Sequence, residues 1–413
     1  MTRPLLLLLA ALPLAAQAPD TAAMARAQHL LQAACAEERA ATWDAAVCGP
    51  LLLATWTGRT VVASERDAAG TFTPVGRWWI GTLGAGQFPS NSAIELGGTR
   101  WSMVVLPLPE DDALATTLLG HEQFHRIQRD LGLPYTDPGN AHLDSERERT
   151  LLRLEWRALA AAIAASGDAS CAHSRDALAL RAARHAAHPG AARSEALLER
   201  HEGMAEYTGQ RLAAARFAGG DQRLRDHLRQ AEAWPSYVRS FAYASGAAYG
   251  ALLDRGDPVW RTRIRQDSAG PAELLAATLR CPDTEQALSA RADRYGGQVV
   301  ASEERHRSDS LTTRRQDYRA RLVEGPVLRS PDGALRFTFD PNAVFPLGEH
   351  GNVYPSGTFS GAWGSLEVVR GGALVSADFR TVQVPLGGRE RGDWTLTLSD
   401  GWRVGENGQV VGP

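Results

Sequence analysis

The sequence contains no lysine, so all 44 of its basic residues are arginine. It also lacks long runs of like charge, and its formal net charge is −3. Nucleic-acid binding needs a basic patch, so this composition gives no reason to expect a nucleic-acid partner. Beyond residue 18 no apolar run is long enough to cross a bilayer, and we expect no membrane span. With 413 residues and 44% hydrophobic content, the chain is expected to form two or three domains.

Residues 1–18 have the features of a secretory signal peptide. One cation, Arg3, precedes an apolar run from Leu5 to Ala16, and small residues follow. The apolar run is too short to span a membrane as a mature helix. We therefore expect a bacterial protein that is exported to the periplasm or secreted.

Cysteine is scarce, with four residues in the whole chain. None of them shows the C-x-x-C spacing of a zinc site, so the cysteines are expected to be structural. An even number in an oxidising compartment favours disulfides, and three pairings are possible. We expect the pairing of neighbours along the chain, Cys35 with Cys48 and Cys171 with Cys281.

Residues 19–110 are predicted to be mainly strands that follow one helix. The Ala and Leu content of Thr21 to Arg39 predicts that helix. From Leu51 to Leu108, short runs of aliphatic, β-branched and aromatic residues alternate with glycine and proline, which indicates a small twisted sheet. Gly97 and Gly98 are predicted to form a hairpin turn.

Residues 111–323 are predicted to be helical almost throughout. The first helix is expected from Asp111 to Arg129, with acidic residues in its first turn. Beyond Pro326 the pattern changes to alternation with period two, so residues 327–413 are predicted to be an all-β, sandwich-like domain. The expected fold class is α+β.

The most informative stretch contains the pattern H-E-x-x-H, formed by His121, Glu122 and His125. Residues four apart lie on one face of a helix, so both imidazoles can reach the same metal ion. Glu122 then lies about 100° round the helix, beside the metal. Two neutral nitrogen ligands and a nearby carboxylate suit one catalytic Zn²⁺ and a general base for a zinc-bound water.

A catalytic zinc needs a third protein ligand and an open position for water. The metzincin extension after His125 is missing, because Gln128 and Leu131 occupy the positions of its glycine and histidine. The third ligand must come from farther along the chain. Four carboxylates compete for this role: Asp144, Glu146, Glu155 and Glu202.

Asp144 and Glu146 lie near the spacing used by thermolysin-like and aminopeptidase N-like enzymes, but their surroundings alternate in charge as in a solvated helix start. Glu155 is an acid within an apolar helix. It suits a metal ligand, an ion pair with Arg157 or Arg126, or a partner that orients a zinc-binding histidine.

Glu202 is the strongest candidate, in the stretch E-G-M-A-E-Y. This stretch resembles the second zinc-binding motif of the gluzincin metallopeptidases, N-E-G-x-A-x-Y, whose first glutamate binds the metal. The small Gly203 and Ala205 would let two zinc-binding helices approach closely. The chain departs from the motif by having His201 where asparagine is common, and by a long separation from His125.

A hydrogen-bond donor is also expected for the negative charge that develops on the attacked carbonyl. The stretch Y-A-S-G that begins at Tyr243 resembles the Y-x-x-G stretch carrying this donor in aminopeptidase N-like enzymes. Tyr243 is our choice, with Tyr249, Tyr207 and Arg239 as alternatives. A tyrosine packed in the core is an equally valid reading of the pattern.

The resemblance covers residues 111–254 and implies a zincin-like core and a Zn²⁺-dependent peptidase. His121, His125 and Glu202 would hold zinc, and Glu122 would serve as general base on a peptide or protein substrate. The strand from Trp101 to Val105 is expected to be an edge strand that aligns the peptide. Two other functions stay open, a non-catalytic exported binding protein and a zinc hydrolase of a non-peptide bond. Specificity and oligomeric state stay open too.

Overall fold

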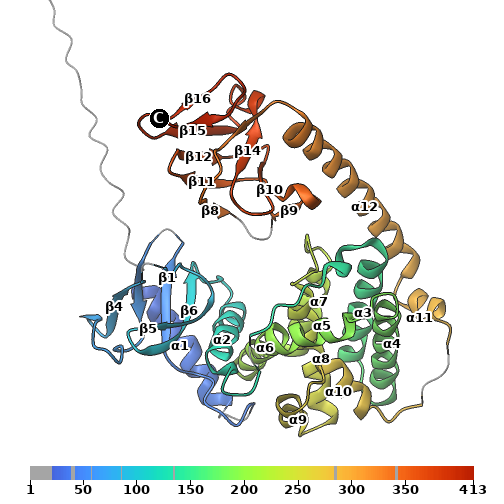
Figure 1. Cartoon of the computed structure of the whole chain (residues 1–413). Helices are drawn as coiled ribbons and strands as arrows, with labels where there is room; N and C mark the ends of the chain where they lie inside the picture. Colours follow the sequence, from blue (N-terminus) through green and yellow to red (C-terminus); the bar gives the residue numbers. More distant parts are fainter. Residues whose placement is uncertain are drawn as a thin grey trace, which may run out of the picture. The chain divides into compact units, whose positions relative to one another are not determined.

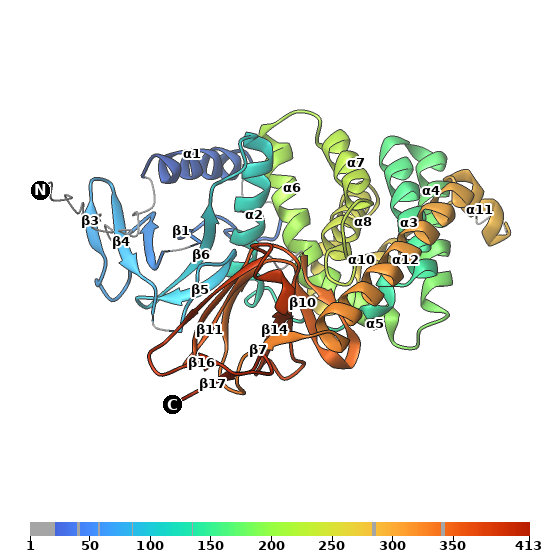
Figure 2. The ribbon, with the colours of Figure 1, turned by 90° about the horizontal axis from the view of Figure 1, so that it is seen from above.

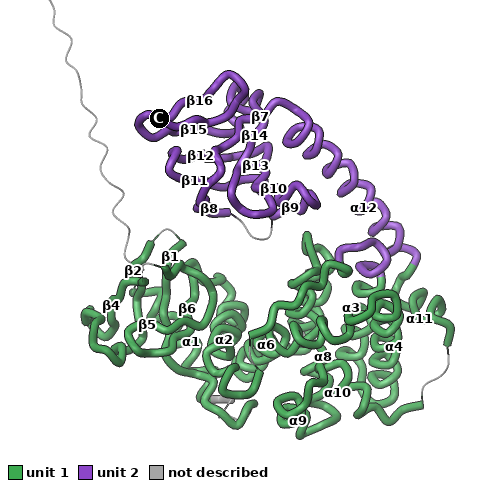
Figure 3. Tube along the Cα trace, in the orientation of Figure 1, with its two compact units in different colours: residues 1–143, 151–297 green, residues 144–150, 298–413 purple. Residues whose placement is uncertain are grey.

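The computed structural model describes residues 21–38, 42–56, 58–84, 86–133, 135–282, 286–339 and 343–413. The predicted signal peptide, residues 1–18, lies outside them. The chain divides into two compact units (Figure 3). The first unit comprises residues up to 143 together with 151–297, and the second comprises residues 144–150 together with 298–413. Apart from its first residue, helix α12 therefore belongs to the second unit, although it was predicted as part of the helical region 111–323.

The first unit begins with a helix and a sheet (Figure 1). The sheet has six strands in the order β3-β4-β2-β1-β6-β5. Strands β1 and β6 are parallel, and every other neighbouring pair is antiparallel. Apolar side chains of α1, β1, β6 and α2 form one core, so α1 and α2 pack against the sheet. The elements are α1 Thr21–Glu38, β1 Leu51–Thr55, β2 Thr60–Ala63, β3 Thr73–Val75, β4 Trp78–Thr82, β5 Ser92–Leu96, β6 Thr99–Leu106 and α2 Asp112–Gln128.

The predicted hairpin is confirmed. Gly97 and Gly98 join β5 to β6, and both have positive φ, 60° and 72°. A two-residue turn of this kind needs φ > 0 at both positions, which glycine adopts without strain.

The predicted edge strand is wrong. Residues Trp101 to Val105 lie in β6, which is paired on one side with β1 and on the other with β5. The long apolar character of this segment reflects its place in mid-sheet, because a strand buried on both faces needs no polar alternation. The last strand at that end of the sheet is β5.

The rest of the first unit is helical, as predicted. Helix α6 lies between α2 and α8 (Figure 2). Helix α2 begins after Asp111, whose carboxylate accepts a hydrogen bond from the backbone N–H of Leu114 at 2.8 Å and so caps the helix. The helices after α2 are α3 Glu146–Ala164, α4 Gly167–His185, α5 Ala191–Leu198, α6 Met204–Arg216, α7 Gly220–Ala231, α8 Phe241–Gly256, α9 Trp260–Gln266, α10 Pro271–Thr278 and α11 Leu288–Arg294.

Helices α2 and α6 meet backbone to backbone at two glycines. A Cβ added to Gly120 would lie 2.9 Å from the Cα of Gly209. A Cβ added to Gly209 would overlap the carbonyl oxygen of Thr117 and lie 3.1 Å from the backbone nitrogen of His121. The absence of side chains at these positions therefore sets the distance between the two helices.

We expect Gly209→Ala to destabilise the protein by about 1–3 kcal/mol, because a backbone carbonyl cannot rotate away from the new methyl group. The two helices must separate, so the affinity of the expected zinc site on α2 should fall as well. Thermal denaturation and a zinc competition titration measure both effects. Gly256→Ala is the matched control, since a Cβ there meets nothing within 4 Å. Equal losses in the two variants would contradict this account.

Both expected disulfides are confirmed, Cys35–Cys48 and Cys171–Cys281. Each lies within the first unit. Structural disulfides of this kind are typical of oxidising compartments. Among the helices of the described residues, none combines the length and the apolar character that a membrane crossing requires.

The second unit carries one long helix and an all-β region of antiparallel sheets, which confirms the α+β class. A five-stranded sheet and a four-stranded sheet contribute side chains to one shared core. The helix is α12 Gly297–Arg319, and the strands are β7 Val327–Arg329, β8 Arg336–Phe339, β9 Phe345–Pro346, β10 Asn352–Tyr354, β11 Gly357–Gly361, β12 Gly364–Val368, β13 Ala373–Val375, β14 Val382–Pro385, β15 Trp394–Leu398, β16 Arg403–Val404 and β17 Val410–Val411.

Candidate metal centre

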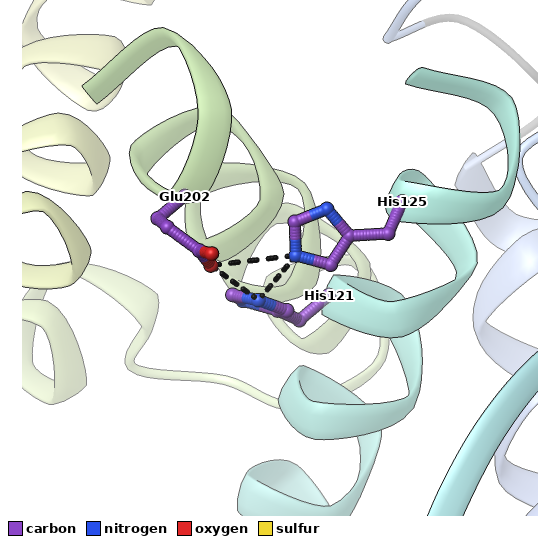
Figure 4. A group of neighbouring side chains, drawn as sticks. All are labelled: His121, His125 and Glu202. Carbon is purple, nitrogen blue, oxygen red and sulfur yellow. Dashed lines mark hydrogen bonds and ion pairs between the residues drawn. The ribbon is translucent and has the colours of Figure 1, made fainter. Parts of the chain in front are cut away.

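Three of the predicted site residues, His121, His125 and Glu202, converge on one point (Figure 4). The Nε2 atoms of the two histidines are 3.0 Å apart. One carboxylate oxygen of Glu202, Oε2, lies 3.3 Å from Nε2 of His121 and 3.4 Å from Nε2 of His125. Three donor atoms from two helical segments therefore face one another.

The local backbone explains this convergence. Both histidines lie on α2, four residues apart and on one face. Glu202 lies in a π-helical turn, Glu199–Gly203, which connects α5 to α6. The wider turn changes the direction in which side chains leave the helix, and π-turns are frequent at functional sites. Gly203 lets this turn approach α8, because a Cβ there would lie 2.8 Å from the Cα of Gly246.

The donor set fits a zinc ion. Tetrahedral zinc with bonds of 2.0–2.2 Å places its ligand atoms about 3.3 Å apart, and the three separations here are 3.0, 3.3 and 3.4 Å. The Oε2 atom of Glu202 is also buried without a hydrogen-bond partner among the described residues. Leaving a buried carboxylate oxygen unpaired is costly, and a bound cation would satisfy it.

Two further side chains orient the histidines, and sequence reasoning missed both. Glu206 lies 3.1 Å from Nδ1 of His121, and the side-chain oxygen of Gln128 lies 2.7 Å from Nδ1 of His125. With both Nδ1–H groups donating to these oxygens, each Nε2 presents a lone pair to the metal position. The signal was helical spacing: Glu206 follows Glu202 by four residues, and Gln128 follows His125 by three.

The electrostatics of the site favour a positive charge. Burial alone would lower the pKa of His121, but the Glu202 and Glu206 carboxylates raise it to about 10. Burial alone would raise the pKa of Glu202, but His121 and His125 lower it well below its usual range. Two buried carboxylates thus stay ionised around neighbouring imidazoles, and a divalent cation that replaced the proton of His121 would compensate their charge.

We expect Glu206→Gln to lower zinc affinity by about 10–100-fold, because loss of the outer carboxylate weakens the orientation and basicity of His121. A competition titration against a chromogenic chelator measures the change. Gln210→Ala is the control, because Gln210 donates to the other oxygen of Glu206 and leaves the contact with His121 in place. An unchanged affinity in Glu206→Gln would contradict the role assigned to this residue.

Glu122, the predicted general base, is buried next to the three converging side chains. Its Oε2 atom has no hydrogen-bond partner among the described residues. Burial raises the pKa of the Glu122 carboxyl. A carboxylate whose proton affinity is raised in this way accepts a proton from water more readily than an exposed one.

Tyr243 also reaches the site. Its ring stacks on that of His121, with centroids 5.3 Å apart and an angle of 3° between the planes. Burial, and next the Glu202 carboxylate, raise the pKa of Tyr243, so its hydroxyl keeps its proton and remains a donor. The alternatives Tyr249 and Tyr207 direct their hydroxyls elsewhere, to Glu155 and Asp254 respectively.

Of the three competing carboxylates, two form ion pairs elsewhere and the third is exposed. Glu155 is fully buried and pairs with Arg181 at 3.2 Å and Arg184 at 2.5 Å. Asp144 pairs with Arg149 at 3.2 Å. Glu146 is exposed in the first turn of α3. The group that gathers around one point contains Glu202 and none of these three.

Comparisons with protein-family models, with curated proteins and with solved structures found no match to this chain.

Proposed function

We propose that the chain is an exported zinc-dependent peptidase with a zincin-like core. The observation that carries the proposal is the set of three donor atoms at 3.0, 3.3 and 3.4 Å, the separations expected around zinc. The Glu122 carboxylate beside this set, whose Oε2 atom has no hydrogen-bond partner among the described residues, supports a hydrolase over a binding scaffold, because a scaffold has no use for a base. The two disulfides and the predicted signal peptide support export.

His121, His125 and Glu202 would hold the zinc, which would act as a Lewis acid and lower the pKa of a coordinated water to about 7. Glu122 takes a proton from the attacking water and then delivers it to the leaving amine. The Tyr243 hydroxyl donates a hydrogen bond to the oxygen on which negative charge develops. Glu206 and Gln128 keep the two imidazoles in the required tautomer.

The edge strand β5 offers a place for the peptide chain. It pairs with β6 on one side, and no strand of the described residues pairs with its other side. It also lies beside α2, the helix that carries both histidines. An extended peptide that adds to β5 would use main-chain hydrogen bonds and so run past the zinc site.

The proposal is tested with the purified mature chain. We expect about one zinc per chain by atomic spectrometry, cleavage of a mixed peptide library, and loss and recovery of that cleavage on chelation and zinc addition. If the protein binds zinc and hydrolyses esters or other non-peptide substrates but no peptides, it is a different zinc hydrolase. Bound zinc without any hydrolysis would favour a binding protein, and absence of zinc binding would overturn the proposal.

A further inference from the structure

Arg239 connects the candidate metal ligand Glu202 to an exposed aspartate. One guanidinium nitrogen, Nη2, lies 2.5 Å from Oε1 of Glu202, the oxygen that faces away from the two histidines. The other, Nη1, lies 2.5 Å from Oδ2 of Asp137. A single arginine thus binds a buried carboxylate on one side and an exposed carboxylate on the other.

The two ion pairs differ in exposure. The Glu202 side chain is 4% exposed, whereas those of Asp137 and Arg239 are 42% and 41% exposed. An exposed pair contributes about 0–1 kcal/mol, so its partner can be exchanged at little cost. The buried contact with Glu202 keeps the guanidinium in place during such an exchange.

The surroundings of Arg239 are partly exposed to solvent. The nearby ionisable groups are Glu202, Asp137, His201 and the hydroxyls of Tyr243 and Tyr135. Tyr135 is 70% exposed, and its ring packs edge-on against the ring of His201 at 4.6 Å. Within this set, Asp137 is the one exposed anion that Arg239 contacts.

We propose that Arg239 binds a carboxylate of the substrate, which replaces Asp137 on the guanidinium. This inference rests on the proposed peptidase function and names its substrate class: peptides with a free C-terminal carboxylate close behind the scissile bond. Arginine suits the role because its planar fork matches a carboxylate with two parallel hydrogen bonds. The enzyme then removes one or two residues from the C-terminus.

The length of an extended substrate peptide supports the position of that carboxylate. Glu202 presents one oxygen to the histidines and the other to Arg239, so a single carboxylate group separates the guanidinium from the metal position. An extended peptide advances about 3.3–3.6 Å per residue. A carboxylate bound by Arg239 therefore belongs to the first or second residue after the attacked carbonyl.

Two peptides of the same sequence, one with a free C-terminus and one with a C-terminal amide, test the proposal. We expect kcat/KM of the zinc-loaded enzyme to favour the free acid by roughly 10–100-fold, the range for hydrogen bonds to a charged group. Arg239→Gln should abolish this preference, and zinc content is measured alongside because Arg239 touches Glu202. Asp137→Asn should lower KM for the free acid and leave the amide unchanged. Asp130→Asn, an exposed change of the same charge, is its control.

A binding assay provides a second measurement that does not depend on turnover. N-acetylphenylalanine and its amide are titrated into the wild type, Asp137→Asn and Arg239→Gln by calorimetry. We expect the wild type to bind the acid more tightly than the amide. This difference in affinity should be largest in Asp137→Asn and absent in Arg239→Gln. Equal binding of acid and amide by all three proteins would overturn the proposal.

The outcomes separate this inference from the proposed function. Equal cleavage of the free acid and the amide overturns the carboxylate subsite while the peptidase function stands. Cleavage of neither peptide by zinc-loaded enzyme counts against the peptidase function, and the binding assay then decides on the carboxylate subsite by itself.

Discussion

Replacement of Glu122 by glutamine is expected to lower kcat/KM for peptide hydrolysis by roughly 10²–10⁴-fold, the usual contribution of a positioned general base. Glutamine has nearly the same size but cannot accept the proton of the attacking water at neutral pH. Zinc should remain bound, because Glu122 is not among the three residues that converge on the metal position. Steady-state kinetics and metal analysis of the same preparation provide the two measurements.

Glu110→Gln is the matched control for this experiment. Glu110 is exposed just before α2. The hydrogen bond from Arg26 goes to its backbone oxygen, so a change of its side chain leaves that bond in place. The same chemical change there should leave both zinc content and kinetics as in the wild type. Full activity of Glu122→Gln with bound zinc would exclude Glu122 as the general base.

The second large effect is expected on metal binding, when Glu202 is replaced by alanine. Zinc held by protein ligands has apparent binding free energies of about 10–16 kcal/mol, so removal of one of three ligands should weaken binding by about 10²–10⁴-fold. The loss should exceed that of Glu206→Gln, since Glu206 acts through His121. Metal analysis after dialysis against a weak chelator ranks the variants.

Glu155→Ala separates a ligand from a buried ion-pair partner. This change leaves Arg181 and Arg184 without one of their buried carboxylates, which typically costs about 3–5 kcal/mol of stability. The fraction that folds should nevertheless bind zinc like the wild type. Retained zinc in Glu202→Ala together with lost zinc in folded Glu155→Ala would reverse the assignment.

The sequence was most informative where local rules decide the structure. Acidic residues in the first turn predicted the start of α2, and the pair Gly97-Gly98 predicted the hairpin between β5 and β6, because each signal depends on residues a few positions apart. The H-E-x-x-H spacing placed both histidines on one face for the same reason. The gluzincin resemblance directed attention to Glu202, which lies at the point where the histidines meet.

The remaining features depend on contacts between distant segments. Whether β6 is an edge strand depends on its pairing with β1, in which the paired residues Leu51 and Ser102 are 51 positions apart (102 − 51), and no local pattern encodes this pairing. In the sequence, Glu155 and Glu202 are both acidic residues of predicted helices. In the structure, Arg181 and Arg184 of α4 form ion pairs with Glu155. The link from Arg239 to Asp137 likewise joins a residue just before α8 to one in a connecting segment.

The division of the donor set between α2 and the turn before α6 has a thermodynamic consequence. A metal ion that binds the folded chain and not the unfolded one raises the free energy of unfolding, by about 4 kcal/mol when free zinc exceeds Kd a thousandfold. The three candidate ligands lie on two segments far apart in the chain, so a bound ion would act as a reversible cross-link between the sheet-bearing and the helical parts of the first unit. Unfolding of that unit should therefore depend on zinc concentration.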